Sequence, residues 1–183
     1  WRSPRVGAGS ERHPTSDPGL TRSLLPEVTF TTKMVLHCGE TEIHLLHYPG
    51  STPGATWVWV PDAKVIFTGD SVFQDTHPFL ASAQLNDWQD SLKHLRQTIF
   101  RDHTIVPGRS GPIDHNGLQF SVDYLRYLRR RLSAWREQGI LASDAHQLAP
   151  ALLDRFPVTA GKNAQMESRL KAGLQHVFTT LRT

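Results

Sequence analysis

The sequence predicts an α/β protein in which helices pack against a mixed β-sheet. Two observations support this class. Short β-rich runs come first, from residue 28 to residue 70, and helical and strand-like patterns then alternate before the chain ends in helical patterns alone. This order is typical of a sheet with helices against it.

Residues 1–27 predict an irregular N-terminal arm. Pro4, Pro14, Pro18 and Pro26 remove backbone donors, and three glycines raise the entropy of the unfolded chain. The segment has no apolar stretch of the kind that a secretory signal requires, and no initiator Met. We therefore expect a processed product or a fragment of a longer chain, whose folded domain covers residues 28–183.

Five runs between residues 28 and 70 predict strands: Val28–Phe30, Lys33–Cys38, Thr41–Tyr48, Ala55–Val60 and Lys64–Asp70. Gly39–Glu40 and Pro61–Ala63 carry turn residues between neighbouring runs. In the fourth run Trp57 and Trp59 face one way, while valines at 58 and 60 face the other. Because both faces are apolar, we expect this strand to be covered on both sides.

The rest of the chain predicts helices around one further strand, Thr104–Val106. Asn86 is the expected cap of a first helix, Ser143 of a short helix before Pro157, and Asn163 of the last helix. A long helix between the first and the short one is expected to end at Gly139. The apolar positions expected inward are Leu85, Trp88, Leu92, Leu95 and Ile99 in the first helix; Leu118, Val122, Leu125, Leu128, Leu132 and Trp135 in the long one; and Met166, Leu170, Leu174, Val177 and Leu181 in the last.

Composition excludes several classes of protein. The chain has 183 residues, of which 38% are hydrophobic, and no apolar run is long enough for a transmembrane helix. A net charge of +3 is too small to indicate nucleic-acid binding, and the arginines at 126 and 129–131 are typical of a solvated helix face. The single cysteine, Cys38, predicts a reducing compartment, so we expect a cytoplasmic location with no membrane and no nucleic-acid partner.

Three glycine-bearing loops follow predicted strands: His47–Gly54, Phe67–Ser71 and Val106–Pro112. The stretches PGSTPGATWVWVPDAKVIFTGDSVF, NDWQDSLKHLRQTIF and VPGRSGP occur in the order and spacing of the later motifs of the metallo-β-lactamase superfamily. The resemblance spans about Val28 to Leu132. It implies a metallo-β-lactamase-like αββα sandwich, largely its C-terminal half, with sheet and helices over residues 28–132 and a helical tail over 140–183.

In that superfamily this half supplies a His in the first loop, the Asp of Gly-Asp and a His in the third loop as metal ligands. Carried over by position, these are Ser51, Asp70 and Arg109, so only Asp70 matches. The earlier His-x-His-x-Asp-His segment is absent from this chain. A serine hydroxyl is a poor zinc ligand, and a guanidinium cannot ligate.

The resemblance implies a metal-dependent hydrolase of an ester, thioester, lactone or phosphoester bond in a small-molecule substrate, incomplete or degenerate in this chain. Asp70 would be the catalytic residue and the ligand of zinc or another divalent metal, and Ser51, His77 and Arg109 would contact the substrate. The alternative is a non-catalytic binding or scaffold domain in which an Arg109–Asp70 pair replaces the metal.

Half of a two-sheet sandwich would expose the apolar face of its sheet. We therefore expect the chain to pair with a missing N-terminal half or with a second copy of itself. Structural roles are expected for His47 and His115, and core positions for Trp57, Trp59, Trp88 and Trp135.

Overall fold

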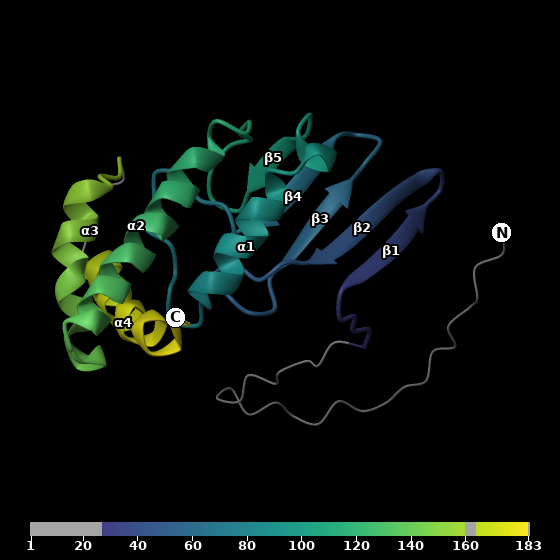
Figure 1. Cartoon of the computed structure of the whole chain (residues 1–183). Coiled ribbons are helices and arrows are strands. Elements are labelled where there is room, and N and C mark those ends of the chain that lie inside the picture. The colour runs from purple at the N-terminus through teal and green to yellow at the C-terminus, as the bar shows by residue number, and fades with distance from the viewer. Residues whose placement is uncertain (1–26, 160–163, 183) are drawn as a thin grey trace, which may run out of the picture.

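The computed structural model describes residues 27–159 and 164–182. Five strands in these ranges form one sheet in chain order: β1 (Lys33–Cys38), β2 (Thr41–His47), β3 (Thr56–Val60), β4 (Val65–Gly69) and β5 (Thr104–Pro107). The first four pair antiparallel, and β5 pairs parallel with β4 (Figure 1). The predicted mixed sheet is therefore confirmed.

The β-hairpin turns lie where the turn residues predict them. Gly39, between β1 and β2, has a φ of +64°, which glycine adopts without strain. The predicted strand at Val28–Phe30 is wrong, because strand pairing begins only at Lys33. β2, the partner of β1, ends at His47, whose backbone N–H donates to the Thr32 carbonyl at 2.9 Å, so among the described residues no strand pairs with residues 28–30.

The helical part comprises α1 (Leu85–Leu95), α2 (Leu118–Glu137), α3 (Ala149–Arg155) and α4 (Ala164–Thr180), with 3-10 helices at Thr98–Phe100 and Ala142–Leu148. The long helix and its end before Gly139, which has a φ of +76°, are confirmed. Ile99 is 54% exposed and does not continue the buried stripe, because α1 ends at Leu95 and a 3-10 helix turns the chain differently.

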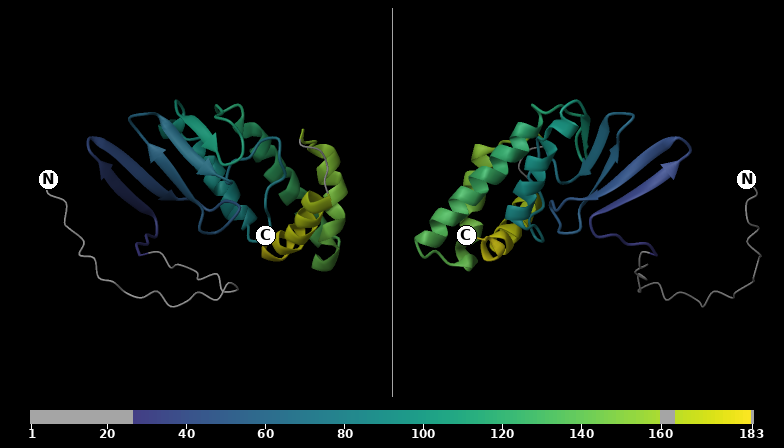
Figure 2. Two further views of the ribbon diagram at one scale, coloured as in Figure 1. Left: turned by 180° about the vertical axis from the view of Figure 1, so that it is seen from behind. Right: turned by 45° about the vertical axis from the view of Figure 1, so that its right-hand side comes forward.

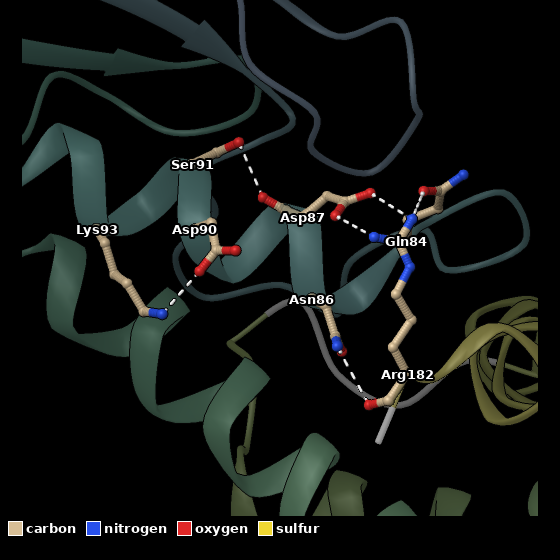
Figure 3. Close-up of polar contacts among 7 residues, drawn as sticks. All are labelled: Gln84, Asn86, Asp87, Asp90, Ser91, Lys93 and Arg182. Atoms are coloured by element: carbon tan, nitrogen blue, oxygen red, sulfur yellow. Dashed lines mark hydrogen bonds and ion pairs between the residues drawn. The ribbon is translucent and has the colours of Figure 1, made fainter.

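Two of the three predicted helix caps do not cap a helix in the structure, and the third lies outside the described residues. Asn86 lies inside α1, and Gln84 holds the N-cap position. The Asn86 side-chain amide instead donates to the Arg182 carbonyl at 3.2 Å (Figure 3). Ser143 lies within the 3-10 helix Ala142–Leu148 and makes no capping hydrogen bond, and Asn163 lies outside the described residues.

The segment after α4 is tied to the start of α1 and to the end of α2. The Arg182 guanidinium lies 3.4 Å from the Asp87 carboxylate and donates to the Gln84 side chain (Figure 3). Arg136 of α2 donates to the Leu181 carbonyl at 2.7 Å. These contacts fix the end of α4 against both earlier helices, so the helical tail packs into the same core as the sheet.

One face of the sheet packs against the helices. Trp57, Ile66 and Ile105 are fully buried there together with Trp88 of α1 and Leu125 of α2. Trp59 and Trp135 are half-buried against the same core, which confirms the core role predicted for the tryptophans. None of the described helices is long and apolar enough to cross a membrane.

The opposite face of the sheet, which we call the open face, is uncovered by the described helices (Figures 1 and 2). The strand register and the alternation of side chains place these residues on it: Met34, Leu36, Ile43, Leu45, Val58, Val60, Val65, Phe67 and Val106. Phe67 is 44% exposed and Leu36 41%. Within the described residues, the prediction that β3 is covered on both sides is therefore wrong, since its two valines are only half-buried.

The half-buried side chain of His103 accepts a hydrogen bond from a tryptophan of β3. Trp59 Nε1 donates to His103 Nε2 at 2.9 Å, which requires that nitrogen to be unprotonated. Burial, and then the nearby charge of Lys64, lower the pKa of His103 below its ordinary value of 6.5.

We therefore expect the free energy of unfolding to be fully retained above about pH 6.5 and to fall as the pH drops below it. In that range the unfolded chain binds a proton that the folded chain resists. Urea unfolding between pH 5 and pH 8 measures this loss, and His103→Asn should flatten the dependence. An identical slope in the parent and the variant would contradict the assignment.

Candidate functional site

The parallel pairing of β4 with β5 brings two loops to the same edge of the sheet. Gly69 ends β4 opposite Pro107, which ends β5. The carboxyl ends of neighbouring parallel strands are a common location for binding sites in α/β folds. Asp70 and Arg109, which follow these two strands, therefore become neighbours although 39 residues separate them in the chain.

Asp70 and Arg109 form a two-pronged ion pair. Arg109 Nε donates to Asp70 Oδ1 at 3.0 Å, and Arg109 Nη2 donates to Oδ2 at 3.0 Å. The Asp70 side chain is 39% exposed and that of Arg109 58%, so solvent reaches the pair. The hydrogen bonds and the charge of the carboxylate raise the pKa of Arg109 further above its ordinary value, which keeps the guanidinium protonated.

Gly108 allows the two loops to approach closely. Its backbone N–H donates to the Gly69 carbonyl at 2.9 Å. A Cβ atom at this position would lie 2.9 Å from Asp70 Oδ1 and 3.1 Å from the Gly69 carbonyl carbon, closer than packed atoms normally come. The loop after β5 thus needs glycine here for Arg109 to reach Asp70.

The first glycine-bearing loop packs beside the second. A Cβ on Gly50 would lie 2.2 Å from Ser71 Oγ, so the backbone of this loop contacts the residue after Asp70. Ser51 itself is buried, and it is not among the residues that line the cavity at Asp70. The His47 ring nitrogen bonds to the Pro53 carbonyl at 2.8 Å and so stabilises this loop from within.

A cavity of about 150 Å³ opens beside the ion pair. Its described lining residues come from three segments: the loop after β4, the loop after β5 and the first half of α4. The lining residues are Asp70, Phe73, Thr76, His77, Pro78, Phe79, Arg109, Gln165, Met166, Arg169 and Leu170. Of the candidate residues from the sequence, Asp70, His77 and Arg109 therefore meet at one cavity.

The His77 ring forms a hydrogen bond with a buried tyrosine of α2. Its Nδ1 lies 3.0 Å from the hydroxyl of Tyr124, which is fully buried in α2. Burial raises the pKa of Tyr124 well above its usual range, so the hydroxyl keeps its proton. Nearby, the Asp75 carboxylate accepts a hydrogen bond from the Thr159 backbone at 2.6 Å, which fixes the same loop. Hydrogen bonds from the side chain and then the backbone of Thr159 lower the pKa of Asp75.

The contribution of α4 was not predicted from the sequence. Gly173 lets α4 approach the loop before α1, since a Cβ there would lie 2.5 Å from the Leu80 Cβ. This contact places Gln165 and Arg169 at the cavity. The available signal was weak: Arg169 precedes the inward-facing Leu170 and flanks the buried stripe of the last helix.

Comparison with known proteins decides the family. The model of the metallo-β-lactamase superfamily matches residues 3–109. This chain belongs to the metallo-β-lactamase superfamily. The match includes both Asp70 and Arg109, so the ion pair lies within the part of the chain that carries the family relationship.

Solved structures agree on the fold. A metallo-β-lactamase family protein from Thermus thermophilus is similar over 85% of this chain, with a TM-score of 0.58 and 17% identity. A metallo-β-lactamase from Pontibacter korlensis is similar over 55%, with a TM-score of 0.51 and 24% identity. The predicted metallo-β-lactamase-like α/β fold is confirmed. The chain spans 49% of the length of each of these proteins, which fits a partial fold.

The metal ion that the superfamily implies does not fit the residues that the structure describes at this site. The three positions that correspond to ligands hold Ser51, Asp70 and Arg109, and Asp70 already binds Arg109 through both oxygens. Within residues 27–159 and 164–182, no group of three or more His, Cys, Asp or Glu side chains is arranged to hold a metal. A fixed guanidinium also repels a cation from the same carboxylate.

Proposed function

We propose that this chain is a non-catalytic binding domain of the metallo-β-lactamase superfamily, in which the Arg109–Asp70 pair takes the place of the metal. The observation that carries the proposal is the two-pronged ion pair between two residues that line the cavity. A paired fork of this kind fixes both side chains in one plane and satisfies both carboxylate oxygens without an ion.

The donor chemistry supports this function over catalysis. Hydrolysis in a metal site needs an ion that activates water, and a stable zinc site normally needs three protein ligands. Here Arg109 stays protonated and Ser51 is buried outside the cavity lining, so only one suitable donor is left at the three positions. Among the described residues of the cavity, no pair combines a nucleophile with an adjacent general base.

Zinc binding tests the proposal. The chain as it exists is expected to bind no more zinc than Asp70→Asn does, because Asp70 is occupied by Arg109. Arg109→His exchanges the guanidinium for an imidazole beside the carboxylate, and we expect it to raise zinc affinity by about tenfold or more. Competition with a chromophoric chelator measures all three proteins.

Two controls make the zinc experiment decisive. The double variant Asp70→Asn/Arg109→His should lose the gained affinity, which separates this position from histidines elsewhere on the surface. The proposal fails if the parent chain binds one zinc per molecule and Asp70→Asn abolishes that binding.

The second candidate function is a metal-dependent hydrolase whose other ligands come from outside this chain. The half-length match to both solved relatives favours it, since the remaining half could carry further ligands. In that protein Arg109 would have to leave Asp70 before the carboxylate could bind a metal. A zinc-dependent loss of the Arg109–Asp70 pair, observed by NMR of the arginine Nε–H, would favour this function over the first.

We also propose that a second β-sheet, contributed by the other half of the sandwich, covers the open face. The support is the apolar surface itself together with the half-length match to the solved relatives. A cytoplasmic location is likewise proposed, because Cys38 is a free and exposed thiol of the kind that a reducing compartment preserves.

A further inference from the structure

The cavity beside Asp70 has more positive than negative charge. Arg109 and Arg169 line it from separate segments of the chain, the loop after β5 and the helix α4, whereas Asp70 is the one carboxylate among the described lining residues. Because Arg109 neutralises Asp70, the charge of Arg169 is left over. A cavity with this balance attracts an anion and repels a cation.

Arg109 keeps hydrogen-bonding capacity after pairing with Asp70. A guanidinium carries five N–H donors. The ion pair uses Nε and Nη2, so the two donors on Nη1 and the second donor on Nη2 are not used by Asp70. Asp70 therefore orients Arg109 and leaves one edge of its guanidinium able to bind an oxygen ligand.

Arg169 is positioned without being neutralised. Its guanidinium carbon lies 5.3 Å from the centre of the Phe79 ring, within the range of a cation–π contact. In the part of the chain that the structure describes, no carboxylate lies within ion-pair distance of Arg169. The aromatic ring thus holds the charge at the cavity and leaves its N–H donors for a ligand.

The remaining walls are largely apolar. Phe73, Pro78 and Leu170 line the cavity as buried residues, and Phe79 lines it as an exposed one. Thr76 and Gln165 add neutral hydrogen-bonding groups. A volume of about 150 Å³ suits a compact molecule that combines one charged group with a small apolar body.

We propose that this cavity binds a small organic anion, whose carboxylate or phosphate group is held by Arg109 and Arg169 and whose apolar part packs against Phe73 and Phe79. This inference rests on the proposed function, since a metal at Asp70 would occupy the same place. It adds the class of ligand and assigns Arg169 of α4 as a binding residue.

The experiment titrates the full chain with benzoate and with phenyl phosphate, and uses benzamide as the neutral analogue. Chemical-shift changes in the NMR spectrum of the labelled protein report binding at each residue. We expect both anions to bind at millimolar or lower concentration and benzamide to bind about tenfold more weakly or not at all. The tighter of the two anions identifies the preferred charged group.

Arg169→Gln is the decisive variant, and Arg130→Gln is its matched control. Both changes remove one arginine from a helix, but Arg130 lies on α2 away from this cavity. Arg169→Gln should weaken anion binding about tenfold, the usual size of a charge-assisted hydrogen bond, and Arg130→Gln should leave it unchanged.

The proposal is overturned if benzamide binds as tightly as the anions or if Arg169→Gln binds them as well as the parent. Its failure is distinguishable from failure of the proposed function. Arg169 takes no part in the hydrogen bonds between Asp70 and Arg109, so the zinc measurements on Asp70 and Arg109 variants are independent of it.

Discussion

Replacing Phe67 and Val58 with lysine is expected to convert the isolated chain from a self-associating species into a monomer. The two side chains are direct cross-strand neighbours on the open face, one from β4 and one from β3. Fully burying an apolar side chain of this size contributes about 1.5–3 kcal/mol, so an uncovered sheet face favours association. Two lysines introduce charges that cannot be buried without a partner.

Sedimentation velocity over a range of concentrations measures this change. Leu141→Lys is the matched control, since Leu141 is also apolar and 67% exposed but lies outside the sheet. The control should associate like the parent. The prediction that the open face drives association is wrong if the parent chain is a monomer at every concentration and does not bind a dye that reports apolar surface.

Trp88→Ala is expected to cause the largest loss of folding stability among single substitutions, about 3–5 kcal/mol. Trp88 is fully buried in α1, and its Nε1 donates to the Ser71 carbonyl at 2.7 Å. The substitution therefore creates a cavity between helix and sheet and leaves a buried carbonyl without its donor. Urea unfolding followed by circular dichroism measures the change.

Trp88→Phe separates packing from hydrogen bonding. It keeps an aromatic ring but removes the Nε1 donor, and we expect a smaller loss of about 1–3 kcal/mol. Because Ser71 directly follows Asp70, this variant should also weaken anion binding at the cavity. Trp135→Phe, at a half-buried position, is the control and should change stability less. Equal stability of Trp88→Phe and the parent would contradict the importance of the Ser71 hydrogen bond.

Much of the fold could be predicted because the decisive signals are local. The alternation in β3 and β4 and the spacing in α2 depend only on which side chains are apolar. The errors arose where tertiary partners decide. Val28–Phe30 has strand-forming residues but, in the part of the chain that the structure describes, no neighbouring strand to pair with. Asn86 has a capping side chain, but its amide donates to the Arg182 carbonyl instead.

Some residues of the candidate site could also be predicted from the sequence, whereas others depend on tertiary packing. Asp70 and Arg109 were predictable, because they stand at the positions of family ligands after two strands and the pair follows from their opposite charges. Arg169 and Phe79 were not, because their proximity to Asp70 depends on how closely α4 docks, which Gly173 permits. An exposed arginine on a helix has no local feature that distinguishes a ligand contact from a solvated surface residue.

The parallel pairing of β4 with β5 also has a consequence for folding kinetics. The hairpins that join consecutive strands from β1 to β4 bring together residues that are close in sequence. Asp70, in contrast, meets Arg109 only after the whole crossover through α1 has docked. Contacts between distant residues form slowly, since the intervening loop must first be closed. The cavity, which needs α4 as well, should therefore be among the last parts of the chain to become structured.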